Sequence, residues 1–74
     1  MITIIKKIIK MNDFIRIHGF YENPTYIIKK SEIQWIMPFK DEAYKRVGAE
    51  ITFENGKKVK SAESVDKIWE MLKS

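Results

Sequence analysis

The chain contains no cysteine and only one histidine, His18, among its 74 residues. Without cysteine there is no disulfide framework, no thiolate metal ligand and no thiol nucleophile. One histidine alone does not build a zinc site, and no metalloprotease or calcium-loop spacing occurs. Nor can a serine–histidine–acid constellation be drawn around it. We therefore expect His18 to be a polar surface residue, and we expect no metal, no cofactor and no enzymatic activity.

Glycine and long apolar runs are also scarce. The three glycines are isolated, so the sequence contains no phosphate-binding loop. No apolar run approaches the ~20 residues that a membrane-spanning helix needs, and lysines interrupt the start of the chain where a signal peptide is continuously apolar. Isoleucine and lysine supply about a third of the residues, a bias typical of AT-rich coding genomes. We expect a protein without a membrane span in the cytoplasm of a bacterial cell or a phage-infected host.

The clearest local signal is a β-hairpin that begins near residue 49. Residues 49–54 alternate apolar and polar side chains, as a strand with one buried face requires. Asn55 and Gly56 tolerate positive φ and mark the turn. A two-residue turn would leave Val59 on the polar face, whereas a three-residue loop ending at Gly56 pairs Val59 with Ile51. Because register follows the buried face, we predict the three-residue loop.

An amphipathic helix is predicted over residues 62–73, because the apolar period changes from two to between three and four after the hairpin. Ser61 or Ser64 is placed to cap its first turn. A helix of about three turns is marginal alone in water, so its apolar stripe must pack on the sheet. We expect Trp69 to be the anchor of that stripe, which comprises Val65, Ile68, Trp69 and Leu72.

Further strands are predicted between residues 14 and 60. The segment 14–18 alternates, with Ile15 and Ile17 facing inward, and the segment 25–29 returns as a second strand. A turn or bulge is expected at residues 30–32.

The next strand is predicted to place Ile33, Trp35 and Met37 on one face and to end at Pro38. The mostly charged residues 39–48 lack alternation, and we interpret them as a connecting loop with a short helical turn.

Residues 1–11 form an extension rich in isoleucine and lysine. A helical wheel separates the two residue types, which would suit contact with a partner or a membrane surface. The abundance of β-branched side chains instead favours a strand. In either form the apolar side chains need cover, and a second subunit would provide it. The candidate self-association residues are Ile2, Ile4, Ile5, Ile8 and Ile9.

The net charge of +4 is unevenly placed, because residues 1–30 hold six basic and two acidic side chains and the remainder holds eight of each. Such asymmetry can mark contact with an anion or nucleic acid. Basic side chains beside aromatic rings such as Tyr21 suit single strands, although no nucleic-acid-binding motif is present. The candidate contact residues are Arg16, Tyr26, Lys29, Lys30, Lys57, Lys58 and Lys60.

Residues 14–72 resemble the small FlbD-like family, which is annotated for flagellar and swarming motility. Four segments carry the resemblance: residues 23–27 (NPTYI), 33–38 (IQWIMP), 51–56 (ITFENG) and 63–68 (ESVDKI). The resemblance implies an accessory protein without catalytic residues. Residues 1–11 and the charged segment 39–48 depart from the family pattern.

Together these observations predict one α+β domain over residues 1–74. It would consist of a small antiparallel sheet of four to six strands, within residues 14–60, and one C-terminal helix packed on one face. The leading hypothesis is a small non-enzymatic bacterial or phage interaction protein that self-associates and modulates a larger protein assembly, with an unidentified protein partner. The alternative is a basic sheet module that binds single-stranded or backbone-accessible nucleic acid.

Overall fold

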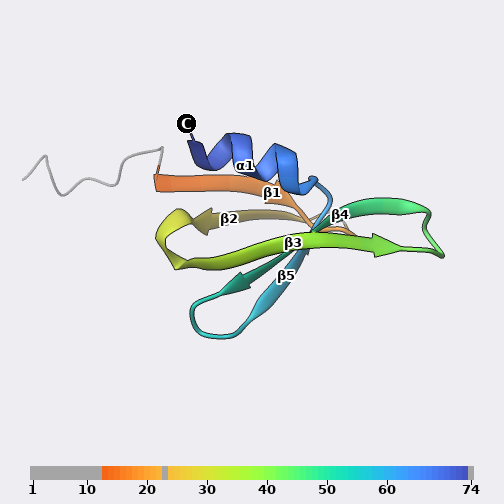
Figure 1. Ribbon diagram of the computed structural model, residues 1–74, viewed down its shortest axis with the longest axis horizontal. Coiled ribbons are helices and arrows are strands. Elements are labelled where there is room, and N and C mark those ends of the chain that lie inside the picture. Colours follow the sequence, from red (N-terminus) through yellow and green to blue (C-terminus); the bar gives the residue numbers. More distant parts are fainter. Residues whose placement is uncertain (1–12, 23, 74) are drawn as a thin grey trace, which may run out of the picture.

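The computed structural model describes residues 13–22 and 24–73. They form two antiparallel sheets and one C-terminal helix (Figure 1), which confirms the α+β class. The candidate self-association isoleucines and the strand-or-helix question at residues 2–10 lie outside these residues. The elements in chain order are β1 (Phe14–His18), β2 (Thr25–Lys29), the 3-10 turn η3 (Lys30–Glu32), β3 (Ile33–Asp41), β4 (Arg46–Phe53), β5 (Lys58–Ser61) and α1 (Val65–Lys73).

The five strands are divided between two sheets instead of forming one. β1 pairs with β2, and the second sheet has the order β3-β4-β5. A single bridge between Gly19 and Ser61 joins them: Phe20 N donates to Lys60 O at 2.9 Å and Ala62 N donates to His18 O at 2.7 Å. This arrangement lets both sheets and the helix enclose one core, as the buried side chains of all three show. The buried apolar residues of that core are Ile15, Ile17, Ile28, Ala49, Ile51 and Ile68.

The β4–β5 hairpin confirms the predicted three-residue loop. Ile51 pairs with Val59, and Phe53 N donates to Lys57 O at 2.8 Å across the loop. Gly56 has φ of 89°, a left-handed conformation that glycine adopts without steric cost.

The prediction that β3 ends at Pro38 and that residues 39–48 form a loop is wrong. β3 continues to Asp41 and β4 begins at Arg46, with Pro38 paired to Ala49. β3 has a partner on one side only among the described residues, and an edge strand tolerates proline because an N–H is not needed toward the free side. The true turn spans residues 42–45. Asp41 Oδ1 stabilises it by accepting from the backbone nitrogens of Ala43 at 2.9 Å and Tyr44 at 3.2 Å.

The predicted face of Ile33, Trp35 and Met37 is also wrong. A β-bulge shifts the register between Ile33 and Trp35, and such a bulge reverses the direction of the side chains that follow it. Ile33 and Ile36 therefore pack against the core. Trp35 and Met37 remain 53% and 47% exposed, on the outer face of the sheet.

The predicted helix forms, but it begins at Val65 instead of residue 62, and it turns a different side chain inward. Ser64 Oγ accepts from Lys67 N at 3.2 Å and so caps the first turn. Ile68 is fully buried whereas Trp69 is 57% exposed, so the prediction of Trp69 as the anchor is wrong. The stripe is centred on Ile68, with Val65, Met71 and Leu72 partly buried beside it. Trp69 is displaced about 100° around the helix axis from Ile68 and falls at the edge of this stripe.

Candidate functional site

A groove between β3 and α1 is lined by both tryptophans of the chain. We call it the tryptophan groove. β3 contributes Trp35 and α1 contributes Trp69, and the groove has a volume of ≈ 340 Å³. Its lining consists of Ile33, Gln34, Trp35 and Ile36 from the strand, and Val65, Asp66, Trp69 and Leu72 from the helix.

Local sequence explains why the groove lies at this position. Four successive residues of β3 line it, so it follows the edge of the strand and not one of its faces. That edge is not paired with another strand within the described residues. The bulge beside Gln34 turns Trp35 out of the core, while the narrow core stripe of α1 leaves Trp69 at the rim. The groove therefore offers apolar side chains next to strand backbone.

The exposure of both tryptophans is the property that makes the groove a candidate site. Trp35 is 53% and Trp69 57% exposed, although tryptophan is highly buried on average in folded proteins. Adjacent exposed apolar side chains in a groove mark sites of association. Tryptophan is also among the residues that contribute most energy to protein–protein interfaces. The groove is suited chemically to an apolar segment of polypeptide.

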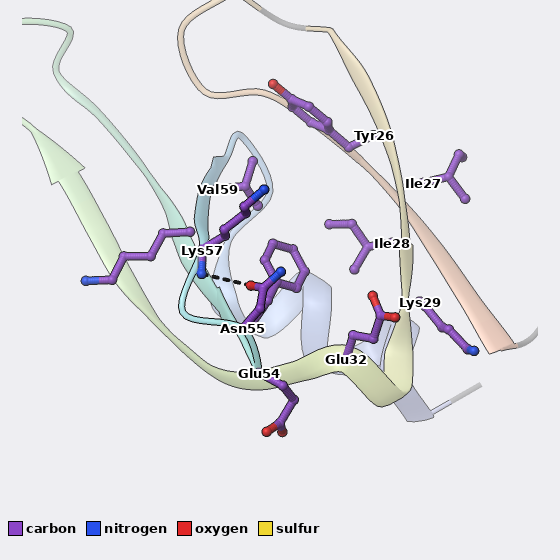
Figure 2. Close-up of a pocket in the computed structure, with 11 residues that line it drawn as sticks. Tyr26, Ile27, Ile28, Lys29, Glu32, Glu54, Asn55, Lys57 and Val59 are labelled. Carbon is purple, nitrogen blue, oxygen red and sulfur yellow. Dashed lines mark hydrogen bonds between the residues drawn. The ribbon is translucent and has the colours of Figure 1, made fainter.

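Four of the predicted nucleic-acid contacts line a second groove, between β2 and the β4–β5 hairpin, which we call the hairpin groove (Figure 2). It has a volume of ≈ 580 Å³ and is lined in part by Tyr26, Lys29, Lys57 and Lys58. Glu32 and Glu54 line it too. Figure 2 shows Ile28 pointing toward the hairpin, whereas Lys29 points away from it. The lysines therefore do not converge on one point.

The remaining predicted contacts are dispersed. Lys60 and Tyr21 line an adjoining hollow of ≈ 340 Å³ that shares Tyr26 and Lys58 with the hairpin groove. Lys60 Nζ lies 3.9 Å from Glu50 Oε2 and 5.0 Å from the centre of the Phe39 ring. Arg16 is exposed on β1, and its cross-strand partner is Ile27. Lys30 Nζ donates to Leu72 O at 3.5 Å. Neither Arg16 nor Lys30 lines either hollow.

An aromatic cluster at the β3–β4 turn was not predicted from the sequence. The Phe20 ring lies 5.0 Å from Tyr21 and 5.0 Å from Phe39, in edge-to-face geometry, and Tyr44 lies 5.1 Å from Tyr21. Arg46 lies over Phe20 at 4.6 Å and also donates to Phe20 O. Gly48 permits this packing, since a Cβ there would lie 2.8 Å from Phe20 Cδ2. The sequence-based prediction assigned residues 39–48 to a loop. It therefore missed the pairing of residues 39–41 with 46–48, which brings these aromatic side chains together.

The cluster is tied to the turn by one short hydrogen bond. Tyr21 Oη donates to Asp41 Oδ2 at 2.6 Å. This bond raises the pKa of the Tyr21 phenol, because the bond is lost when the phenol ionises, and burial adds to the effect. The same bond lowers the pKa of Asp41, because it stabilises the ionised carboxylate. Burial raises this pKa, but the backbone N–H groups of Tyr44 and Ala43 also donate to the carboxylate and lower it further.

His18 is partly exposed, with 45% of its side chain accessible, but it is also hydrogen-bonded to Glu63, a contact that the sequence did not indicate. Its Nδ1 lies 2.8 Å from Glu63 Oε2, and Ser61 Oγ donates to Glu63 Oε1 at 2.7 Å. Burial opposes ionisation of Glu63, but the hydrogen bonds from His18 and Ser61 outweigh it and lower the carboxyl pKa. The serine is fully buried and bonds the carboxylate, not the imidazole. The three residues therefore form a structural clasp and not a nucleophilic triad.

Comparison with known proteins adds no relative. No protein-family model matches the chain, and neither the curated proteins nor the solved structures include a significant match. The resemblance to the FlbD-like family therefore stays a prediction.

Across residues 13–22 and 24–73, no group of three or more His, Asp or Glu side chains is placed to hold a metal ion. No helix in that same part of the chain is long and apolar enough to cross a membrane.

Proposed function

We propose that this chain is a small non-enzymatic interaction protein that self-associates and modulates a larger protein assembly, and that the tryptophan groove is its protein-binding site. The single observation that carries the proposal is the exposure of Trp35 and Trp69 on the lining of one groove. Covering such a pair removes a large apolar area from water, and each Å² contributes about 25 cal/mol. A bacterial or phage origin and a cytoplasmic location are part of the same proposal.

The distribution of charge also favours a protein partner over a polyanion. Residues 13–74 contain eleven basic and ten acidic side chains, whereas residues 1–12 contain three lysines and no acid. Residues 13–74 are therefore nearly neutral. A fold that binds phosphate backbones normally carries a marked basic excess on one face.

Self-association is tested by light scattering coupled to size-exclusion chromatography over a range of concentrations. The wild-type mass should rise with concentration, and Trp69→Ala should weaken association at least about tenfold, as expected for removal of an interface tryptophan. Ile27→Ala is the matched control, because Ile27 is 63% exposed but lies on β2, outside the groove. A monomer at every concentration, or equal effects of the two substitutions, would contradict the proposal.

The second candidate function is binding of single-stranded nucleic acid at the hairpin groove. The observation in its favour is that Tyr26, Lys57 and Lys58 all line that groove, and a base can stack on a tyrosine while lysines meet phosphate.

Labelled oligonucleotides at two salt concentrations test this alternative. Phosphate contact predicts a steep loss of affinity with added salt, and a Lys57→Gln, Lys58→Gln double variant should weaken binding while Lys40→Gln, on β3, should not. Absence of binding at low salt would eliminate the alternative.

A further inference from the structure

The tryptophan groove matches in chemistry residues 1–12, the longest segment of the chain that lies outside the described residues. We propose that the groove binds residues 2–10 of the protein's own N-terminal segment, with isoleucine side chains against Trp35 and Trp69. This inference rests on the proposed role of the groove as a protein-binding site and names its occupant. Three properties of the chain support it: composition, position and the unpaired strand edge.

The composition of the segment complements the groove. Residues 2–10 contain five isoleucines and three lysines. The groove supplies apolar walls from Ile33, Ile36 and Leu72, and one acidic side chain, Asp66. The isoleucines require apolar cover, and a lysine beside Asp66 would gain a favourable charge interaction at the rim. An apolar segment without lysine could pack on the apolar side chains of the groove, but it would make no charge interaction with Asp66.

The segment also joins the fold close to one end of the groove. Phe14, the first residue of β1, pairs with Lys29, and the following Lys30 reaches the carbonyl oxygen of Leu72 at 3.5 Å. Leu72 lines the groove. Figure 1 shows the start of β1, η3 and the C-terminal end of α1 at the same end of the molecule. Nine residues reach about 30 Å at most, more than the length of β3 that lines the groove.

The edge of β3 supplies backbone groups for such a segment. Residues 33–36 line the groove successively and have no strand partner on that side within the described part. Addition of a strand to a free edge is a common way to bind an extended polypeptide. Pro38 offers no N–H, which restricts such pairing to the first half of β3, where Trp35 lies.

Engineered cysteines provide a direct test, because the full-length chain has no cysteine of its own. Ile5→Cys is combined with Gln34→Cys, an exposed position in the groove, or with Val47→Cys, which is 59% exposed on β4 outside it. Under mild oxidation the first pair should form a disulfide at least about tenfold faster than the second, because docking raises the effective concentration of the two thiols. Equal rates would overturn the inference.

Intrinsic fluorescence gives an independent measurement, because both tryptophans of the chain lie in the groove. Ile5→Asp with Ile9→Asp should shift tryptophan emission to longer wavelength, whereas Lys6→Gln with Lys7→Gln should shift it less. Unchanged emission in the aspartate variant, with an unchanged circular dichroism spectrum, would also overturn the inference.

The same cysteines separate this inference from the proposed function. A groove disulfide within one chain, together with a monomeric mass, would support the docking of the segment and contradict self-association. A disulfide between a singly substituted Ile5→Cys chain and a Gln34→Cys chain would support both, because the segment would then be exchanged between copies. Self-association without preferential disulfide formation would retain the proposed function and eliminate residues 2–10 as the occupant.

Discussion

The carboxylate of Glu63 joins the end of β1 to the residues that precede α1 through two contacts with His18. Its Oε2 lies 2.8 Å from His18 Nδ1, and its Oε1 accepts from His18 N at 3.0 Å. The Glu63 side chain is only 14% exposed, whereas that of His18 is 45% exposed. The clasp therefore orients the helix, and with it Trp69, relative to the two sheets.

Glu63→Gln should destabilise the fold by about 1–3 kcal/mol, because an amide cannot replace charge-assisted bonds to the imidazole and the Ser61 hydroxyl equally well. Urea unfolding followed by circular dichroism measures the change. Glu22→Gln serves as the control, since Glu22 is exposed and its substitution should change stability by less than about 0.5 kcal/mol. Equal effects of the two substitutions would show that the clasp does not stabilise the fold.

The same carboxylate predicts a pH dependence of stability. The folded pKa of Glu63 is below its ordinary value of 4.5, so at low pH the unfolded chain binds a proton that the folded chain resists. The contribution of Glu63 is present above that value and is lost as the pH falls through the folded pKa. Urea midpoints from about pH 7 to about pH 3 should therefore fall more in wild type than in Glu63→Gln. Parallel profiles would contradict the assignment.

The hairpin was predictable because two independent constraints agreed. Asn55 and Gly56 identify the turn, and burial of Val59 with Ile51 selects its length. The ends of β3 and β4 were not predictable in the same way. Their charged side chains are exposed at the far end of a hairpin, and Pro38 is acceptable only because β3 is an edge strand, a property of the assembled sheet.

The tryptophan groove was missed because its two walls depend on tertiary detail. The bulge at Gln34 reverses Trp35, and no turn residue in the sequence marks it. On α1, Ile68 and Trp69 are neighbours in an apolar stripe, and only packing against the sheet decides which one is buried. The sequence-based prediction took the largest apolar side chain of the stripe as the one that packs on the sheet. It therefore predicted that Trp69 is buried, whereas Ile68 is.

Gly56→Ala should destabilise the fold by about 1 kcal/mol. The cost arises from the positive φ of 89° and not from a clash, because a Cβ at this position would meet nothing within 4 Å. Gly56→Asn should cost less, since asparagine tolerates the left-handed region better. Thermal unfolding of the two variants tests the ranking. A more stable alanine variant would contradict the observed turn.

Alanine substitutions of Ile68 and Trp69 should distinguish a residue that stabilises the fold from a residue that binds a partner segment. Ile68→Ala removes a fully buried side chain and should lower the free energy of unfolding by about 2–5 kcal/mol. Trp69→Ala removes a side chain that is 57% exposed. In an Ile5→Asp, Ile9→Asp background, where the proposed cover of the groove is weakened, it should cost less than about 1.5 kcal/mol, because much of the indole is then in water. Urea unfolding at one protein concentration measures each loss. Trp69→Ala should cost more in the otherwise wild-type chain, where the groove is covered, and an equal loss in the two backgrounds would contradict cover of the indole by residues 2–10.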